Sequence, residues 1–292
     1  MTDGARPDPG LPAVELPPGV CQFVATPIGN LGDVSQRALA TLATADIVYA
    51  EDTRHTRRLL DRHGVSAPLA SFHDHNAARA VPAIVARLRD GGRVAVVSDA
   101  GMPCISDPGY ALVAALRRED LPYTVVPGPS SVLAALVLAG FPTDRFLFLG
   151  FVPRKGGARR RVLGEALAEP GTSVLLESCH RIRSTLEALR ELDPEREAAV
   201  VREITKLHEE TLRGTADDLL ERLTGPRLRG ELVLVVRGTG ERRRRAGGGA
   251  ATDDGAGDDG AGDDDTGDDD TGDEASRDDT GLDDAGEDEV ED

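Results

Sequence analysis

The sequence predicts an α/β protein with two α/β domains, followed by an acidic tail that does not fold. Apolar runs rich in β-branched residues alternate with helical patterns from residue 20 to residue 236. Loops rich in glycine, proline and aspartate follow several of these runs, as they do at the ligand-binding edge of open α/β sheets. The chain from residue 246 onward has almost no large apolar side chain.

The first domain, residues 19–142, is predicted from five apolar runs separated by helical patterns. Ser35 is a suitable N-cap for the first helix, and Gly64 a suitable end for the second. This alternation predicts a parallel or mostly parallel sheet with helices on both faces. The expected strands are 20–25, 47–50, 69–72, 93–97 and 123–126, and the expected helices are 35–45, 53–63, 77–90, 110–117 and 132–139.

The second domain, residues 143–240, repeats the pattern less clearly. We place the boundary near residues 140–145. Residues 1–18 are rich in proline and lack an apolar stretch, so we expect a disordered N-terminal segment and no signal peptide. The expected strands of the second domain are 146–151, 173–176, 198–202 and 232–236, and its expected helices are 159–168, 182–192 and 216–223.

The negative charge of the chain is concentrated at its C-terminal end. The whole chain carries a net charge of −18, and residues 251–292 hold 21 acidic residues and one arginine, which leaves residues 1–240 close to neutral. Such a segment cannot bury enough apolar surface to offset the entropy lost on ordering, so residues 241–292 are predicted to be disordered. The low isoelectric point therefore does not exclude a nucleic-acid partner for the folded part.

The cysteines and the apolar runs indicate a cytoplasmic protein. Cys21, Cys104 and Cys179 are far apart, and an odd, dispersed set is typical of reduced thiols. The longest apolar stretch lies around residues 132–139, which is too short to span a bilayer.

The loop at residues 98–109, Ser-Asp-Ala-Gly-Met-Pro-Cys-Ile-Ser-Asp-Pro-Gly, is the most informative segment. It joins an expected central strand to a helix. Two prolines stiffen it, and two glycines allow a close approach of the backbone to a ligand. The alternative is an ordinary connection in which Asp107 caps the next helix.

A second glycine-rich loop, residues 26–33, follows the first expected strand. It lacks the three spaced glycines of a dinucleotide fingerprint and the lysine and hydroxyl residue of a P-loop. The sequence therefore disfavours a classical NAD or ATP site, and a simple turn is the alternative.

Two carboxylates and an arginine stripe follow the second expected strand. Glu51 and Asp52 lie at the strand end, where one of them could act as a base or orient a hydroxyl. Arg54, Arg58 and Arg62 are spaced to share one face of the next helix and could contact phosphates. The alternative, favoured by spacing alone, is that Asp52 caps the helix and the arginines are solvated.

Two further clusters follow strands in the pattern. His73 and His75 have the spacing of a metal-ligand pair, but no second ligand cluster accompanies them, so we expect no metal site. A dense basic cluster just past the domain boundary is a candidate polyanion contact, with a solvated linker as the alternative. Its cations are Arg154, Lys155, Arg159, Arg160 and Arg161.

Taken together, these segments resemble the tetrapyrrole methylase superfamily. Within it they are similar to the bacterial enzymes that methylate the ribose 2′-oxygen of a cytidine in the decoding region of 16S rRNA. The resemblance covers roughly residues 20–238. The matching segments, in the family's order, are 25–33, 50–54, 72–76, 98–109, 127–131, 151–155 and 202–206.

The resemblance implies two α/β domains with S-adenosylmethionine bound in the cleft between them, and a homodimer. It also implies that the glycine-rich first loop is not a phosphate cradle. The cofactor contacts that it implies are Pro27, Asp99, Met102, Ser130 and Ser131, with Leu176, Glu177 and Glu231 from the second domain.

The implied reaction is an in-line attack of a cytidine 2′-oxygen on the sulfonium methyl group, within the small ribosomal subunit. From their placement at strand ends, we expect Asp52 or Glu51 to accept a hydrogen bond from the 2′-hydroxyl, and Arg54 and Lys206 to steer the nucleotide. The candidate catalytic residues are therefore Asp52, Glu51 and Lys206. The candidate RNA contacts are Arg54, Arg58, Arg62, Arg154, Lys155, Arg159, Arg160 and Arg161.

Two other functions remain open at this point. A methylase of the same superfamily could act on a corrin precursor, although six Phe, three Tyr and no Trp leave few aromatic side chains for a macrocycle pocket. A noncatalytic ribosome-associated module would transfer no methyl group at all. The identity of the molecule that accepts a labelled methyl group separates these functions.

Overall fold

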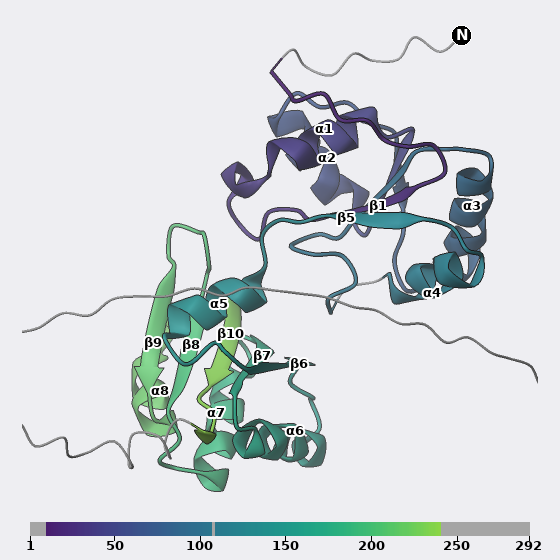
Figure 1. The fold of residues 1–292 in the computed structure, drawn as a ribbon. Helices are drawn as coiled ribbons and strands as arrows, with labels where there is room; N and C mark the ends of the chain where they lie inside the picture. Colours follow the sequence, from purple (N-terminus) through teal and green to yellow (C-terminus); the bar gives the residue numbers. More distant parts are fainter. Residues whose placement is uncertain (1–9, 107–108, 241–292) are drawn as a thin grey trace, which may run out of the picture. The chain divides into compact units, whose positions relative to one another are not determined.

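The computed structural model describes residues 10–106 and 109–240, and the first of its two sheets is parallel throughout (Figure 1). Its strand order is β3-β2-β4-β1-β5, and each pair of neighbours is parallel. The carboxyl ends of all five strands therefore meet at one edge, as expected. The strands are β1 (Cys21–Val24), β2 (Ile47–Ala50), β3 (Leu69–Ser71), β4 (Val94–Val97) and β5 (Tyr123–Val126).

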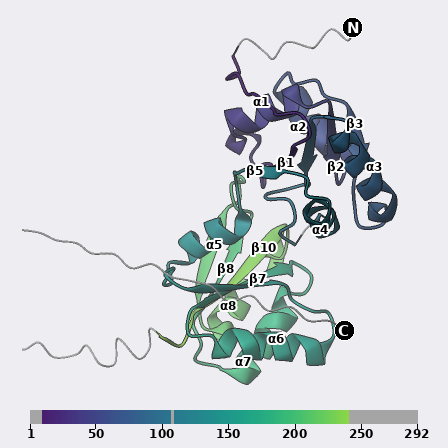
Figure 2. The same ribbon diagram turned by 45° about the vertical axis from the view of Figure 1, so that its right-hand side comes forward.

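Two pairs of helices cover the faces of this sheet (Figure 2). Val48 and Ala50 pack with the first pair, whereas Tyr49 packs with the second. This alternation along one strand confirms a sheet buried on both faces. The first pair is α1 (Gln36–Thr44) and α2 (Thr53–Arg62), and the second pair is α3 (Ala77–Arg89) and α4 (Tyr110–Arg118).

Side-chain caps fix where α1 and α2 begin. The Ser35 hydroxyl accepts a hydrogen bond from the Ala38 amide at 3.0 Å, so the predicted cap of α1 is confirmed. Asp52 caps α2 in the same way. Asp107, the alternative cap of α4, lies outside the described residues.

The second sheet is mixed, in the order β6-β7-β10-β8-β9. Only the β6–β7 pair is parallel, and the other neighbours are antiparallel. The edge strand β9 was not expected from the sequence, because its five residues carry a polar or charged side chain at most positions. The strands are β6 (Phe146–Phe151), β7 (Thr172–Ser178), β8 (Ala198–Arg202), β9 (Glu210–Gly214) and β10 (Glu231–Val236).

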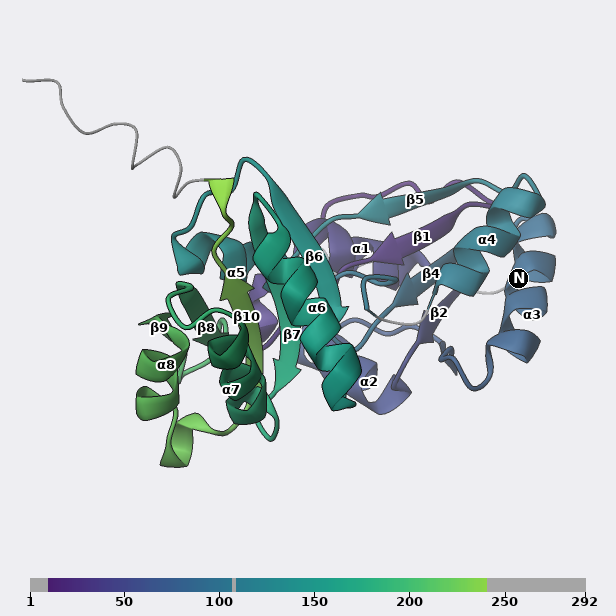
Figure 3. The same cartoon turned by 90° about the horizontal axis from the view of Figure 1, so that it is seen from below.

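Helices cover both faces of the second sheet (Figure 3). Helices α6 (Gly156–Ala168), α7 (Ile182–Leu192) and α8 (Ala216–Arg222) pack on one face, and α5 (Ser131–Ala139) packs on the other. Helix α5 thus belongs by packing to the second sheet, although it precedes the expected boundary near residue 142. The division into domains at 142 and 143 remains a prediction.

The chain ends differ in what the structure describes. Leu16 is only 8% exposed and packs with α1 and α2, contrary to the disorder expected through residue 18. The predicted disordered tail, residues 241–292, lies outside the described residues. Within residues 10–106 and 109–240, none of the helices combines the length and apolarity needed to cross a membrane.

Candidate active site

Loops at the carboxyl edge of the first sheet are joined by backbone hydrogen bonds. Thr26, after β1, pairs with Gly101, after β4, through two bonds of 2.9 and 3.1 Å. The Asp99 carboxylate accepts the Asp52 amide at 2.9 Å, which ties the loop after β4 to the loop after β2. Hydrogen bonds therefore join the two glycine-rich loops, 26–33 and 98–109, that the sequence analysis identified as candidate ligand loops.

Asp52 is engaged with its own helix. One carboxylate oxygen accepts the Arg54 amide at 2.8 Å, and the other pairs with the Arg54 guanidinium at 2.8 Å. The hydrogen bonds from Arg54 hold the pKa of Asp52 well below its usual range. The capping alternative is confirmed, and the carboxylate of Asp52 is a weak base.

Glu51 has the opposite environment. Burial raises the pKa of its carboxyl group, and the nearby Asp99 carboxylate raises it further. The Asp99 amide lies 3.5 Å from one Glu51 oxygen. Of the two neighbouring carboxylates, Glu51 is therefore the stronger base.

Lys206 lies in the loop after β8, between two carboxylates. Its ammonium is 3.0 Å from Glu203 and 3.3 Å from Glu231. Burial acts to lower the pKa of Lys206, but the two carboxylates outweigh it and the pKa is raised. Lys206 therefore carries a positive charge and does not act as a base at neutral pH.

A cavity of about 320 Å³ collects half of the expected cofactor contacts. Ser131, Leu176, Glu177 and Glu231 line it, and the loop after β4 contributes Ala100. The volume is at the lower end of the range of small-molecule sites, about 300–1,000 Å³. The remaining lining residues are Ile105, Ser106, Phe151, Ser178, Cys179, Gly230, Leu232 and Val233.

The cavity suits S-adenosylmethionine chemically. Ile105, Leu176 and Val233 offer apolar walls for a purine ring. Ser131 is the first residue of α5, and the first amides of a helix favour a carboxylate such as that of the methionine moiety. The side chain of Glu231 is 75% exposed, and its carboxylate provides a negative charge that attracts a sulfonium or ammonium group.

The other expected cofactor contacts lie elsewhere or are already engaged. Pro27 and Asp99 line a separate, smaller hollow with Thr26 and His55. Met102 and Ser130 line neither this hollow nor the 320 Å³ cavity. Ser130 instead caps α5 by accepting the Leu133 amide.

Glu177 lines the cavity, but its carboxylate is fully buried. One oxygen pairs with Arg181 at 2.7 Å, and the other accepts the Thr185 hydroxyl at 2.6 Å. Its carboxylate thus has internal partners and serves to hold β7 against α7.

Sequence reasoning missed several apolar walls of the cavity, of which Ile105 and Phe151 are the most exposed. Phe151 is 60% exposed at the end of β6 and Ile105 is 50% exposed in the loop after β4. Such exposure cannot be read from the sequence, because both residues fit a buried position equally well. The proximity of Phe151 to the loop after β4 depends on tertiary packing.

A larger, open cavity of about 890 Å³ brings loops of both sheets together. Its basic side chains are Arg62 and His63, at the end of α2, and Lys206. A Cβ at Gly29 would meet Lys206 side-chain atoms at 2.7 and 2.8 Å, so glycine permits this close approach. The remaining lining residues are Gly29, Asn30, Leu31, Gly32, Thr205 and Leu207.

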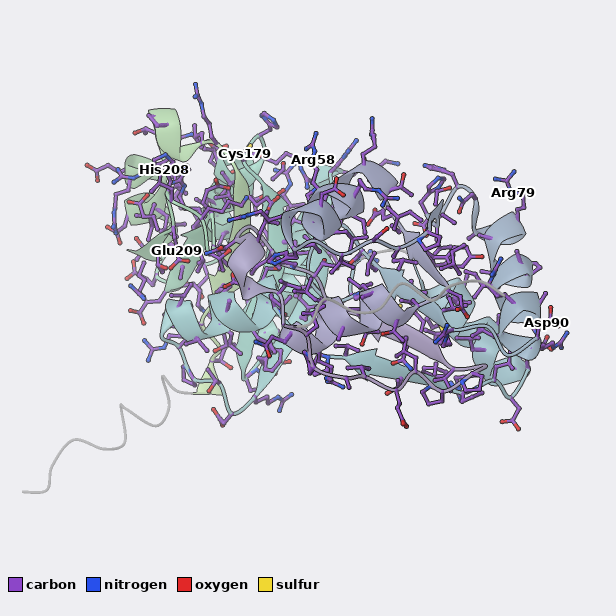
Figure 4. The ribbon with its side chains drawn as sticks, turned by 90° about the horizontal axis from the view of Figure 1, so that it is seen from above. Arg58, Arg79, Asp90, Cys179, His208 and Glu209 are labelled. Carbon is purple, nitrogen blue, oxygen red and sulfur yellow. The ribbon has the colours of Figure 1, made fainter. Side chains whose placement is uncertain are left out.

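The arginine stripe on α2 is exposed, as its spacing predicts. Arg54 is paired with Asp52, whereas Arg58 and Arg62 have no ion-pair partner within residues 10–106 and 109–240. Figure 4 shows Arg58 pointing away from the ribbon, and marks His208 and Glu209 on the loop after β8. The stripe therefore offers two uncompensated cations next to the larger cavity.

The basic cluster around α6 divides into engaged and unpaired cations. Arg159 donates to Ser184 at 2.7 Å, and Arg160 pairs with Glu191 on α7. Arg154, Lys155 and Arg161 are exposed and have no ion-pair partner in the described part of the chain. Only these three are available to a polyanion without breaking an internal contact.

The histidines after β3 contact each other rather than a set of ligands. The rings of His73 and His75 are 6.0 Å apart, edge to face. Among the described residues, no group of three or more His, Cys, Asp or Glu side chains could hold a metal ion.

Comparison with known proteins places these features in a family. The sequence profile described as "Tetrapyrrole (Corrin/Porphyrin) Methylases" matches residues 20–220. Two relatives are named ribosomal RNA small subunit methyltransferase I. The protein from Mesorhizobium japonicum is 46% identical to this chain, over 77% of each chain. The protein from Thermotoga maritima is 43% identical, over 74% of this chain and 97% of the relative.

Solved structures with the same fold are more distant in sequence. Uroporphyrin-III-C-methyltransferase from Thermus thermophilus aligns with a TM-score of 0.54 and 24% identity, over 78% of this chain and 98% of the other. Diphthine synthase aligns with a TM-score of 0.57 and 17% identity, over 75% of this chain and 90% of the other. At these identities the likeness shows the fold alone, so the corrin-precursor alternative has only a distant structural relative in its favour.

Proposed function

Because the chain belongs to the tetrapyrrole methylase family, and within it to the ribosomal RNA small subunit methyltransferase I proteins, we propose that it methylates the 2′-oxygen of a cytidine in the decoding region of 16S rRNA. The chain is an S-adenosylmethionine-dependent rRNA methyltransferase. The proposal adds the acceptor atom, the nucleotide and the roles of individual residues.

One contact carries the proposal, namely the ion pair between Glu231 and Lys206. Glu231 lines the smaller cavity, which suits the methyl donor, and Lys206 lines the larger, basic cavity. The 3.3 Å pair joins the two cavities. A donor held in the first and a nucleotide held in the second would meet at this pair.

The methyl donor would be held by the walls of the smaller cavity. Bound S-adenosylmethionine supplies a methyl group on a sulfonium, and the neutral thioether that departs is a good leaving group. Ser131 and the start of α5 would hold its carboxylate, and Ile105, Leu176 and Val233 would pack on its apolar parts. The protein's main task is then to align the acceptor oxygen and to exclude water.

The acceptor side needs a proton acceptor and a cation. Glu51, whose pKa is raised, would accept the 2′-hydroxyl proton, whereas Asp52 would position Arg54 and the start of α2. Lys206, held protonated by its two carboxylates, would bind a ribose or phosphate oxygen. The exposed cations Arg58, Arg62, Arg154, Lys155 and Arg161 would bind further phosphates of the rRNA.

Methyl transfer to isolated small ribosomal subunits tests the proposal. The purified protein and labelled S-adenosylmethionine should yield 2′-O-methylcytidine at one position, identified by nuclease digestion and mass spectrometry. Glu51→Gln should lower the single-turnover rate about 100-fold or more, the usual contribution of a general base. Asp52→Asn should have a much smaller effect.

Two results would contradict the proposal. A methyl group found on a base or on a tetrapyrrole would reject the acceptor. An unchanged rate in Glu51→Gln would reject the role of Glu51 while leaving the acceptor in place.

The proposal extends to the assembly and its location. We expect a homodimer acting in the cytoplasm, where small subunits are found. Strand β5 is an edge of the first sheet, and Tyr123 and Val125 on it are 40% and 44% exposed, as in a strand that another chain covers. A monomer in sedimentation at micromolar concentration would contradict the dimer.

A further inference from the structure

The side chain of Leu207 is almost entirely in water. It is 92% exposed, more than any other large apolar side chain among the described residues. A single exposed leucine on a protein surface needs no explanation by itself. The loop that carries Leu207 and the cavity beside it give this one a specific setting.

The loop is held in a costly backbone conformation. Glu203 and Thr205 have φ angles of +50° and +67°, although neither is glycine. Such residues cost on the order of 1–3 kcal/mol each and persist only where the surroundings hold them. The energetic cost indicates that the position of the loop tip matters.

Several contacts hold the loop in that conformation. The Glu209 carboxylate accepts the Thr205 amide at 2.6 Å, and the Glu203 carboxylate accepts the Glu231 amide at 3.0 Å. The Lys206 ammonium pairs with both Glu203 and Glu231. Leu207 follows Lys206 directly, so its exposed side chain is presented by a braced turn.

The space beside Leu207 has the chemistry of a nucleic-acid site. Leu207 lines the 890 Å³ cavity together with His63 and the cations Arg62 and Lys206, and Arg58 lies one turn before Arg62 on α2. Cations suit phosphates, whereas an apolar tip suits the face of a base. Acidic peptides would match the cations but would not need the leucine.

We propose that Leu207 is an apolar wedge that packs against a base of the rRNA and keeps the acceptor nucleotide unstacked. This inference rests on the proposed function and assigns the residue that presents the ribose. Sequence-specific recognition of RNA targets bases that are splayed out of the stack, and apolar side chains inserted between bases unstack them in other nucleic-acid complexes. Lys206 would then contact the sugar or phosphate beside the freed base.

A comparison of three variants tests the wedge. Leu207→Ser should lower the single-turnover rate at saturating small subunits roughly tenfold, the scale expected for losing one base contact. Leu207→Met, which keeps an apolar side chain of similar volume, should stay within about threefold of the wild type. Leu192→Ser makes the same chemical change at the end of α7 and should leave the rate unchanged.

Two further measurements separate the wedge from a structural role. S-adenosylmethionine affinity by calorimetry and the thermal midpoint should be unchanged in Leu207→Ser, because the side chain has almost no protein contacts. Arg62→Ala, which removes a phosphate contact, should raise KM and flatten its salt dependence without a comparable loss of the saturated rate.

The outcomes distinguish the wedge from the function it rests on. If the wild-type protein methylates the small subunit but Leu207→Ser does so at the same saturated rate, the wedge is wrong and the function stands. If the wild-type protein modifies no RNA, both are wrong. A loss in Leu207→Ser that appears only in KM would also overturn the wedge, because it would indicate a docking contact.

Discussion

At the scale of single residues, two adjacent carboxylates have opposite proton affinities. Asp52 accepts hydrogen bonds from Arg54 and lies beside its positive charge, so its pKa is lowered. Glu51 is half-buried beside Asp99, and its pKa rises. The sequence shows both groups at one strand end but cannot show which of them lies against a cation and which against a carboxylate. That difference separates a positioning carboxylate from a candidate base.

The raised pKa of Glu51 predicts a pH-dependent effect on stability. A carboxyl group with a raised pKa in the folded state stabilises the protein below its ordinary pKa, about 4.3, and that contribution is lost as the pH rises through the raised value. Glu51→Gln should therefore raise the thermal midpoint at pH 7–8, and this gain should shrink as the pH falls to about 4.

Asp52→Asn is the matched control for this titration. The pKa of Asp52 is lowered, so its contribution to stability is present above its ordinary pKa and is lost as the pH falls. The control should therefore lower the midpoint slightly at neutral pH. Thermal denaturation of both variants from pH 4 to 8 measures whether each substitution raises or lowers the midpoint. A midpoint for Glu51→Gln below the wild type at pH 7.5 would contradict the assignment.

At the scale of elements, the spacing of apolar residues and the helix-capping residues predict the first sheet and its helices well. The bounds of β2 and β5 are as expected, and Ser35 caps α1. Strand β9 is missed because Glu210 and Arg213 break the apolar pattern at an edge where one neighbour suffices. The partners of α5 are missed because its apolar residues fit either sheet, and only tertiary packing selects the second.

The loop before β10 depends on glycine at position 230. Gly230 has a φ angle of +84°, and a Cβ there would overlap the Glu203 side chain. Gly230→Ala should therefore lower the free energy of unfolding by about 1–3 kcal/mol and disturb the Glu203–Lys206 pair. Urea denaturation measures this loss.

Gly164 provides the control for that substitution. It lies inside α6, where an added Cβ would meet nothing within 4 Å. Gly164→Ala should raise the free energy of unfolding by about 0.5–1 kcal/mol, because alanine loses less backbone entropy in a helix. Equal effects of the two substitutions would show that the loop before β10 tolerates a side chain.

At the scale of the whole molecule, charge is divided between the described residues and the end of the chain. Residues 1–240 are nearly neutral and present exposed cations on α2 and around α6, whereas residues 251–292 hold 21 acidic residues. Opposite charges attract most strongly at low ionic strength, because screening is weak there. If the exposed cations bind rRNA as proposed, a polyanionic segment of the same chain would compete for them at a high effective concentration.

This competition predicts that removing the acidic segment strengthens RNA binding. A chain ending at Gly240 should bind small-subunit rRNA more tightly than the full chain at low salt, and the two affinities should converge as the salt concentration rises, because both the masking and the RNA contacts are screened. A chain ending at Ala250 keeps Arg242, Arg243, Arg244 and Arg245, and so separates loss of acidic residues from loss of arginines. Filter binding from 50 to 300 mM salt measures all three chains. Equal affinities of the full chain and the Gly240 chain at low salt would show that the acidic segment leaves the cations accessible to rRNA.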